Sequence, residues 1–94
     1  MPKKKLSPIA SSLIVLLNNV NDLVAISNRR SEAQDVMRAL KIYAENANFI
    51  LPDKTKEKID HFIAAILDSR PITVTYLVRD IAQDIVKTEL GEKV

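Results

Sequence analysis

The sequence contains no cysteine and only one glycine among its 94 residues. The absence of cysteine excludes disulfide bonds, thiolate metal sites and a cysteine nucleophile. A single glycine excludes a glycine-rich phosphate-binding loop and argues against a β fold, because such folds need many tight turns. A chain of this length is also too short for two ordinary domains. We therefore expect one domain built from helices.

The balance of apolar and charged residues is typical of a folded protein. Apolar residues make up 47% of the chain and charged residues 28%, which is too apolar for a disordered chain. The formal net charge is +2, and Lys3, Lys4 and Lys5 contribute three positive charges at one end. Residues 6–94 are therefore close to neutral, and we expect no extended basic face on the folded body.

Capping residues and prolines divide the chain into four expected helices, over residues 8–27, 31–50, 54–69 and 73–90. Ser7 and Pro8 are typical of a helix start, and Ser31 with Gln34 forms a capping-box pattern. Pro52 and Pro71 end the second and third helices, Asp53 caps the third, and Gly91 ends the fourth. Residues 1–6 are expected to form a flexible basic tail and residues 92–94 a second tail.

Apolar residues recur every three or four positions in each expected helix, which is the spacing of one buried helical face. The connections are only about three residues long, and short connections favour antiparallel neighbours. We therefore predict a compact antiparallel up-down-up-down four-helix bundle. The expected core is Ile9, Leu13, Leu16, Leu17, Val20, Leu23, Val24, Ala33, Val36, Met37, Leu40, Tyr43, Ala44, Ala47, Ile50, Ile59, Phe62, Ile63, Ile66, Leu67, Val74, Leu77, Val78, Ile81 and Ile85.

A second line of residues runs along the fourth helix, opposite its core face, at alternating spacings of four and three. Apolar residues aligned on a surface favour a partner-binding site, and tyrosine and arginine are enriched at interfaces. Two residues of the second helix, seven positions apart, extend the pattern. The predicted partner-binding residues are Ile42, Phe49, Tyr76, Arg79, Gln83, Val86 and Leu90, with Ile72 at the start of the line. The alternative is ordinary scattered surface hydrophobics, or helices packed at steeper angles.

Basic residues outside the core give a second set of candidates. Lysines at the start of the third helix are unfavourable beside the helix dipole, but they and free backbone N–H groups can together bind an anion. The candidate anion-binding or nucleic-acid-binding residues are Lys3, Lys4, Lys5, Arg29, Arg30, Lys54 and Lys56. The alternative is that all of them are simply solvated.

Catalytic patterns are missing from the sequence. His61 is the only histidine, and with Glu57 it provides two possible ligands where a zinc site needs three or four. No nucleophile is spaced to meet His61 on one helical face, and no pair of carboxylates is expected to face the bundle interior. We expect no enzymatic activity, no cofactor, no metal and no small-molecule substrate.

The apolar stretch Ile9–Leu17 is shorter than the roughly 20 residues of a membrane span, and no signal cleavage site follows it. We therefore expect a cytoplasmic protein without a membrane span. The predicted function is a small non-enzymatic protein-interaction module, such as an adaptor, regulator, inhibitor or assembly subunit. We expect it to self-associate as a dimer through an apolar face on the second and fourth helices. The alternative is an accessory protein that binds nucleic acid through its basic tail and loops.

Overall fold

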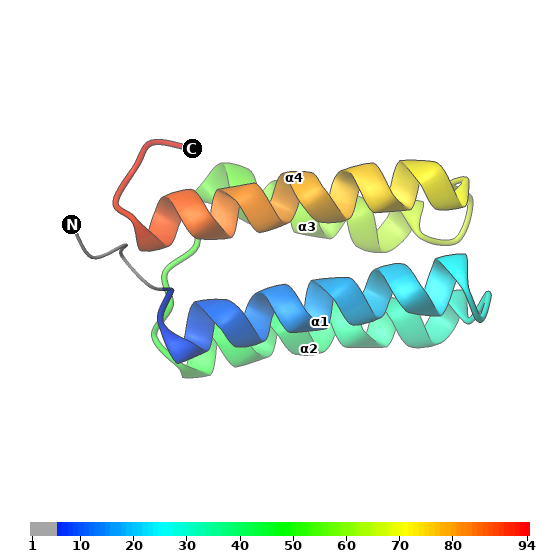
Figure 1. The fold of residues 1–94 in the computed structure, drawn as a ribbon, viewed down its shortest axis with the longest axis horizontal. Coiled ribbons are helices and arrows are strands. Elements are labelled where there is room, and N and C mark those ends of the chain that lie inside the picture. Colours follow the sequence, from blue (N-terminus) through cyan, green and yellow to red (C-terminus); the bar gives the residue numbers. More distant parts are fainter. Residues whose placement is uncertain (1–5) are drawn as a thin grey trace.

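The computed structural model describes residues 6–94, which form four helices. They are α1 (Pro8–Ala25), α2 (Arg30–Asn46), α3 (Asp53–Ala65) and α4 (Pro71–Glu89). Successive helices run antiparallel, with α1 and α4 in front of α2 and α3 in Figure 1. Each helix contacts the next one in the chain, and α4 closes the bundle against α1. The prediction of an antiparallel four-helix bundle is confirmed.

The first and last helix boundaries form as the capping residues predict. The backbone N–H of Ala10 donates to Ser7 Oγ over 3.1 Å, so Ser7 caps α1, and Pro8 is its first residue. Gly91 follows α4 with a φ of 74°, the left-handed conformation that glycine adopts at helix ends. The backbone N–H of Ser7 also donates to Glu89 Oε1 over 3.2 Å, which joins the start of α1 to the end of α4.

The ends of α1 and α2 differ from the prediction because two asparagines adopt left-handed backbone conformations. Asn28 has a φ of 50° and Asn48 a φ of 58°, which asparagine tolerates better than most residues. As a result α2 ends at Asn46, and the N–H of Phe49 donates back to the carbonyl oxygen of Ala44 over 2.9 Å. Pro52 was predicted to end this helix, but it lies several residues after the observed end of α2.

The capping prediction for α2 is wrong. The helix begins at Arg30, so Ser31 lies inside it, and no side chain caps its first turn. The Gln34 amide instead donates to the carbonyl oxygen of Ile63 over 2.8 Å, which ties α2 to α3. Asp53 is the first residue of α3 and also makes no capping hydrogen bond.

Most predicted core residues are buried or half-buried between the four helices, and three are exposed. Tyr43, Ile50 and Leu67 are exposed, and Ile50 retains 81% of its surface. Ile50 and Leu67 leave the helical register because α2 and α3 end before them. The core also includes residues that periodicity did not assign to it: Leu6, Ala10, Leu51, Thr55 and Asp84. Leu6 therefore packs against the core, whereas residues 1–5 of the predicted tail lie outside the described residues.

Candidate protein-interaction site

The outward surface of α4 carries the longest line of exposed and half-exposed apolar residues in the predicted site. We call it the α4 outer face: Ile72, Tyr76, Arg79, Gln83, Val86 and Leu90. Ile72 and Tyr76 keep 76% and 72% of their surfaces exposed. Arg79 and Gln83 are also exposed, whereas Val86 and Leu90 are half-buried. The α4 outer face therefore has a protruding apolar end, a polar middle and a flatter apolar end.

A shallow groove between α1 and α4 adjoins the flatter end of this face. Its volume is about 520 Å³, and Ile14 of α1 together with Ala82 and Val86 of α4 gives it a largely apolar lining. Arg79, Gln83, Lys87 and Glu92 form its polar margin. The α1–α4 groove thus adjoins the C-terminal half of the α4 outer face, whereas Tyr76 protrudes from its N-terminal half.

The structure does not bring the two predicted α2 residues to this surface. In the bundle α2 contacts α1 and α3 but not α4, so the two helices are diagonal. Ile42 is 58% exposed beside the groove between α2 and α3. Phe49 is half-buried in the connection after α2 and packs against the core. The expected single face across α2 and α4 is therefore divided into two separate surfaces.

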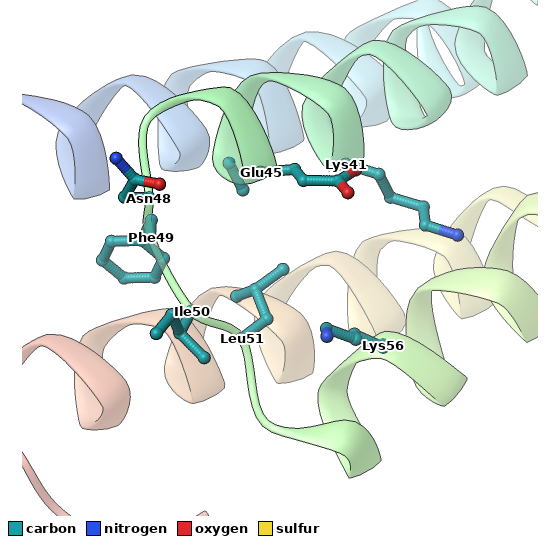
Figure 2. A pocket seen from close by; sticks show the side chains of 8 residues that line it. Lys41, Glu45, Asn48, Phe49, Ile50, Leu51 and Lys56 are labelled. Atoms are coloured by element: carbon teal, nitrogen blue, oxygen red, sulfur yellow. The ribbon is translucent and has the colours of Figure 1, made fainter.

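Phe49 lines a small pocket of about 290 Å³ where α2 passes into α3. Figure 2 shows Phe49, Ile50 and Leu51 in the connecting segment, with Lys41 and Glu45 contributed by α2 and Lys56 by α3. Lys41 also forms an ion pair with Asp60 of α3. The pocket combines an apolar wall with a few charged groups and has no arrangement of groups that would activate a nucleophile.

Arg29, which precedes α2, and Arg30, its first residue, both interact with other groups of the protein. The Arg30 guanidinium donates to the carbonyl oxygens of Ile66 and Ser69, the latter over 2.7 Å. It therefore satisfies the carbonyl of Ile66 at the end of α3, where helices leave such acceptors unpaired, and the carbonyl of Ser69 in the turn that follows. Arg29 lies 3.5 Å from Glu32, with both side chains exposed.

The candidate basic residues also lie at opposite ends of the bundle. Arg29 and Arg30 lie at the turn between α1 and α2, whereas Lys54 and Lys56 are exposed at the start of α3 (Figure 1). The bundle is 41 Å long, so these two groups form no continuous basic surface. Lys3, Lys4 and Lys5 lie outside the described residues.

A buried acidic residue of α4, Asp84, joins this helix to α3. Asp84 is only 4% exposed and accepts hydrogen bonds from Thr55 Oγ1 over 3.0 Å and Lys58 Nζ over 2.8 Å. Lys58 Nζ also lies 3.2 Å from Asp80. We call Thr55, Lys58, Asp80 and Asp84 the α3–α4 polar cluster.

The α3–α4 polar cluster is a packing element. The hydrogen bond from Lys58 to Asp84 raises the pKa of the ammonium above its usual 10.5; burial opposes this shift, and Asp80 adds to it. Lys58 is therefore protonated at neutral pH, and it neutralises the buried carboxylate while Thr55 fills a further acceptor position. The cluster joins α3 to α4 through hydrogen bonds and ion pairs. Asp80 and Asp84 are one helical turn apart. Two like charges at this spacing repel each other on a helix surface, and this was the sequence feature that could have indicated a basic partner for them.

His61 is exposed at the margin of a groove of about 360 Å³ between α3 and α4, with Glu57 and Asp80 nearby. Among residues 6–94 no three His, Cys, Asp or Glu residues are grouped so that they could hold a metal ion. Within the part of the chain that the structure describes, one helix, α1, is long and apolar enough to span a membrane. Core helices of soluble proteins and signal sequences meet the same criteria.

Comparison of the chain with protein-family models, with curated proteins and with solved structures gave no match.

Proposed function

We propose that this protein is a non-enzymatic interaction module that binds a protein partner through the α4 outer face and the adjoining α1–α4 groove. The observation that carries the proposal is the exposure of Ile72 and Tyr76, at 76% and 72%, on successive turns of one helix. Single exposed hydrophobics are ordinary, but neighbouring ones on one helical face are typical of interaction sites. An adaptor, regulator, inhibitor or assembly subunit acting in the cytoplasm would use such a surface.

The composition of the α4 outer face supports a protein partner more strongly than the α2 surface does. Tyrosine and arginine are the residue types most often found at the energetic centre of protein interfaces, and Tyr76 and Arg79 lie one turn apart. Ile42 is isolated by comparison, since Asp35, Arg38 and Glu45 occupy the neighbouring outward positions of α2. The proposed site is therefore restricted to α4 and α1.

Accessory binding to nucleic acid is the alternative function. Its support is the exposure of Lys54 and Lys56 close together at one end of the bundle. The internal hydrogen bonds of Arg30 and the neutral charge balance of residues 6–94 weaken it. Nucleic-acid-binding domains instead concentrate their basic residues on one face.

Photo-cross-linking in living cells tests the proposed site. A photo-reactive phenylalanine analogue replaces Gln83 on the α4 outer face, and the same analogue at Ile42 on the opposite side is the control. We expect covalent adducts from position 83, with a second copy or with another protein, and their loss when Tyr76→Ala is added. Tyr76 is exposed, so its truncation should leave stability within about 0.5 kcal/mol. Equal adducts from both positions, or adducts insensitive to Tyr76→Ala, would show that the proposed function is wrong.

A further inference from the structure

Helix α3 packs against the rest of the bundle more loosely than the other three helices do. α1 lies close to α2 and to α4 along its length, whereas α3 approaches α2 and α4 closely at only a few positions. Only three residues of α3 are buried, namely Thr55, Ile59 and Phe62, against five in α1. A groove of about 360 Å³ runs between α3 and α4, and one of about 500 Å³ between α3 and α2.

Polar contacts supplement this limited packing on both sides of α3. The α3–α4 polar cluster holds the helix to α4. On the other side Lys41 of α2 forms an ion pair with Asp60, and the Gln34 amide donates to the carbonyl oxygen of Ile63. The Lys41 and Asp60 side chains are exposed to solvent, and an exposed ion pair contributes little to stability. The attachment of α3 therefore depends strongly on the polar cluster.

The sequence of α3 gives the helix little stability of its own. It is the shortest of the four helices, with 13 residues, and no side chain caps its first turn. Lys54, Lys56 and Lys58 occupy its first two turns, where positive charge is unfavourable beside the helix dipole, and Asp53 is the only acidic residue of the first turn. Isolated helices of this length are marginal in water. We therefore expect α3 to unfold once it leaves the bundle.

The other three helices are joined by contacts that do not involve α3. Thr75 Oγ1 of α4 donates to Asn21 Oδ1 of α1 over 2.6 Å, and the N–H of Ser7 donates to Glu89 at the other end of the same pair of helices. α3 is connected to α2 by residues 47–52 and to α4 by residues 66–70. Figure 2 shows the first connection as a non-helical segment between α2 and α3. Both connections allow α3 to separate while α1, α2 and α4 stay in place.

We propose that the protein has a second, open form, in which α3 leaves the bundle and unfolds while α1, α2 and α4 remain packed together. Proteins open in cooperative units of this kind when one segment has few buried apolar contacts. The α3–α4 polar cluster stabilises the closed form, because its hydrogen bonds and ion pairs are broken in the open form. The inference is independent of the proposed function, since α3 belongs neither to the α4 outer face nor to the α1–α4 groove.

Opening changes the apolar surface on the side of α4 that faces α3. In the closed form Leu77 and Ile81 of α4 line the groove between the two helices together with Phe62 and Ala65 of α3. Phe62 and Ile81 are each only 1% exposed, so the departure of α3 uncovers this side of α4. The two forms therefore present different apolar surfaces, and a ligand that bound only the open form would shift the population toward it.

Native-state hydrogen exchange, followed for each backbone amide by NMR, tests for the open form. In the wild-type protein we expect the hydrogen-bonded amides of α3 to exchange at least about tenfold faster than the slowest amides of α1, after correction for intrinsic rates. The reason is that exchange in α3 requires only the open form, whereas exchange in α1 requires unfolding of the whole bundle. Amides of α3 that exchange as slowly as those of α1 would overturn the proposal.

Two substitutions distinguish the open form from global unfolding. Lys58→Ala removes contacts that are lost in both, so it should accelerate exchange in α3 and in α1 by the same factor, about tenfold or more. Ile14→Ala is the matched control, because Ile14 lines the α1–α4 groove with Val86, and these two helices stay packed in the open form. It should accelerate the slowest α1 amides by about threefold to tenfold and leave the α3 amides unchanged.

Two other results of the same experiment would contradict the open form. Equal acceleration of α3 and α1 amides by Ile14→Ala would show that the two helices unfold together. Amides of α3 that Lys58→Ala does not accelerate would show that they exchange by local fraying within a helix that stays attached to α4. Either result overturns the open form and leaves the proposed function untouched.

Discussion

Removal of the Lys58 ammonium tests whether the α3–α4 polar cluster holds α3 in place. In Lys58→Ala the carboxylate of Asp84 stays buried, with Thr55 as its remaining hydrogen-bond donor within the cluster. Breaking a fully buried ion pair costs about 3 to 5 kcal/mol, whereas an exposed pair contributes less than about 1 kcal/mol. The Lys58 side chain is 38% exposed and that of Asp84 only 6%. We therefore expect a loss between these limits, of about 2 kcal/mol.

Chemical and thermal unfolding followed by circular dichroism measures this loss. For a domain of this size, 1 kcal/mol corresponds to about 4 to 8 °C in Tm, so Lys58→Ala should lower the Tm by about 8 to 16 °C. Lys56→Ala is the matched control, because Lys56 is exposed on the same helix, and it should stay within about 0.5 kcal/mol of wild type.

A double-mutant cycle separates loss of the ion pair from loss of packing. Asp84→Asn should lower the free energy of unfolding more in the wild type than in the Lys58→Ala background. In that background the substitution removes a buried charge that has already lost its main partner, the Lys58 ammonium. A loss below about 0.5 kcal/mol for Lys58→Ala would refute the reasoning. Equal costs of Asp84→Asn in both backgrounds would also refute it.

Three further predictions follow from the contacts within the bundle and from its charge distribution. The folded-state pKa of Lys58 is raised above 10.5, so the Lys58 ammonium contributes stability below that pH, and this stability is lost as the pH rises through the folded-state pKa. The difference in free energy of unfolding between wild type and Lys58→Met should therefore be constant from pH 7 to about 10 and shrink above that. Arg30→Ala should cost about 1 to 3 kcal/mol in urea unfolding, because it leaves carbonyl groups at the end of α3 unpaired, and Arg30→Lys should recover little, since an ammonium lacks the planar fork of donors. In mobility-shift assays at low salt we expect no stable complex with DNA or RNA; a complex that weakens steeply with salt would instead support the nucleic-acid alternative.

The sequence predicts the fold well because the determinants of the bundle are local. Apolar spacing marks the buried face of each helix, and Ser7, Pro8 and Gly91 mark helix boundaries that the structure confirms. Pro71 was predicted to end the third helix, but α3 ends earlier, at Ala65, and Pro71 is instead the first residue of α4. The end of α2 is missed because it depends on the left-handed conformation of Asn48. That conformation is one of several that asparagine adopts, and the sequence pattern does not distinguish it from a helical residue.

The features that sequence analysis misses depend on which helices meet. Asp84 is buried because Lys58 and Thr55, more than 25 positions earlier in the chain, lie beside it on α3, and no local spacing indicates that pairing. The division of the predicted site has a topological cause, since the second and fourth helices of an up-down-up-down bundle are diagonal. That relation excludes Ile42 from the surface that contains Tyr76.

The central claim, that the α4 outer face is the interaction surface, is tested most directly by the molar mass of the complex that this face forms, measured by light scattering behind size exclusion. If the partner is a second copy, as the sequence predicts, the mass should rise with concentration from 10.5 kDa toward twice that value, about 21 kDa. With either kind of partner, Tyr76→Ala should raise the dissociation constant at least about tenfold, because the complex loses an interface anchor, and Ile42→Ala should match wild type. Equal weakening by Tyr76→Ala and Ile42→Ala would contradict the account.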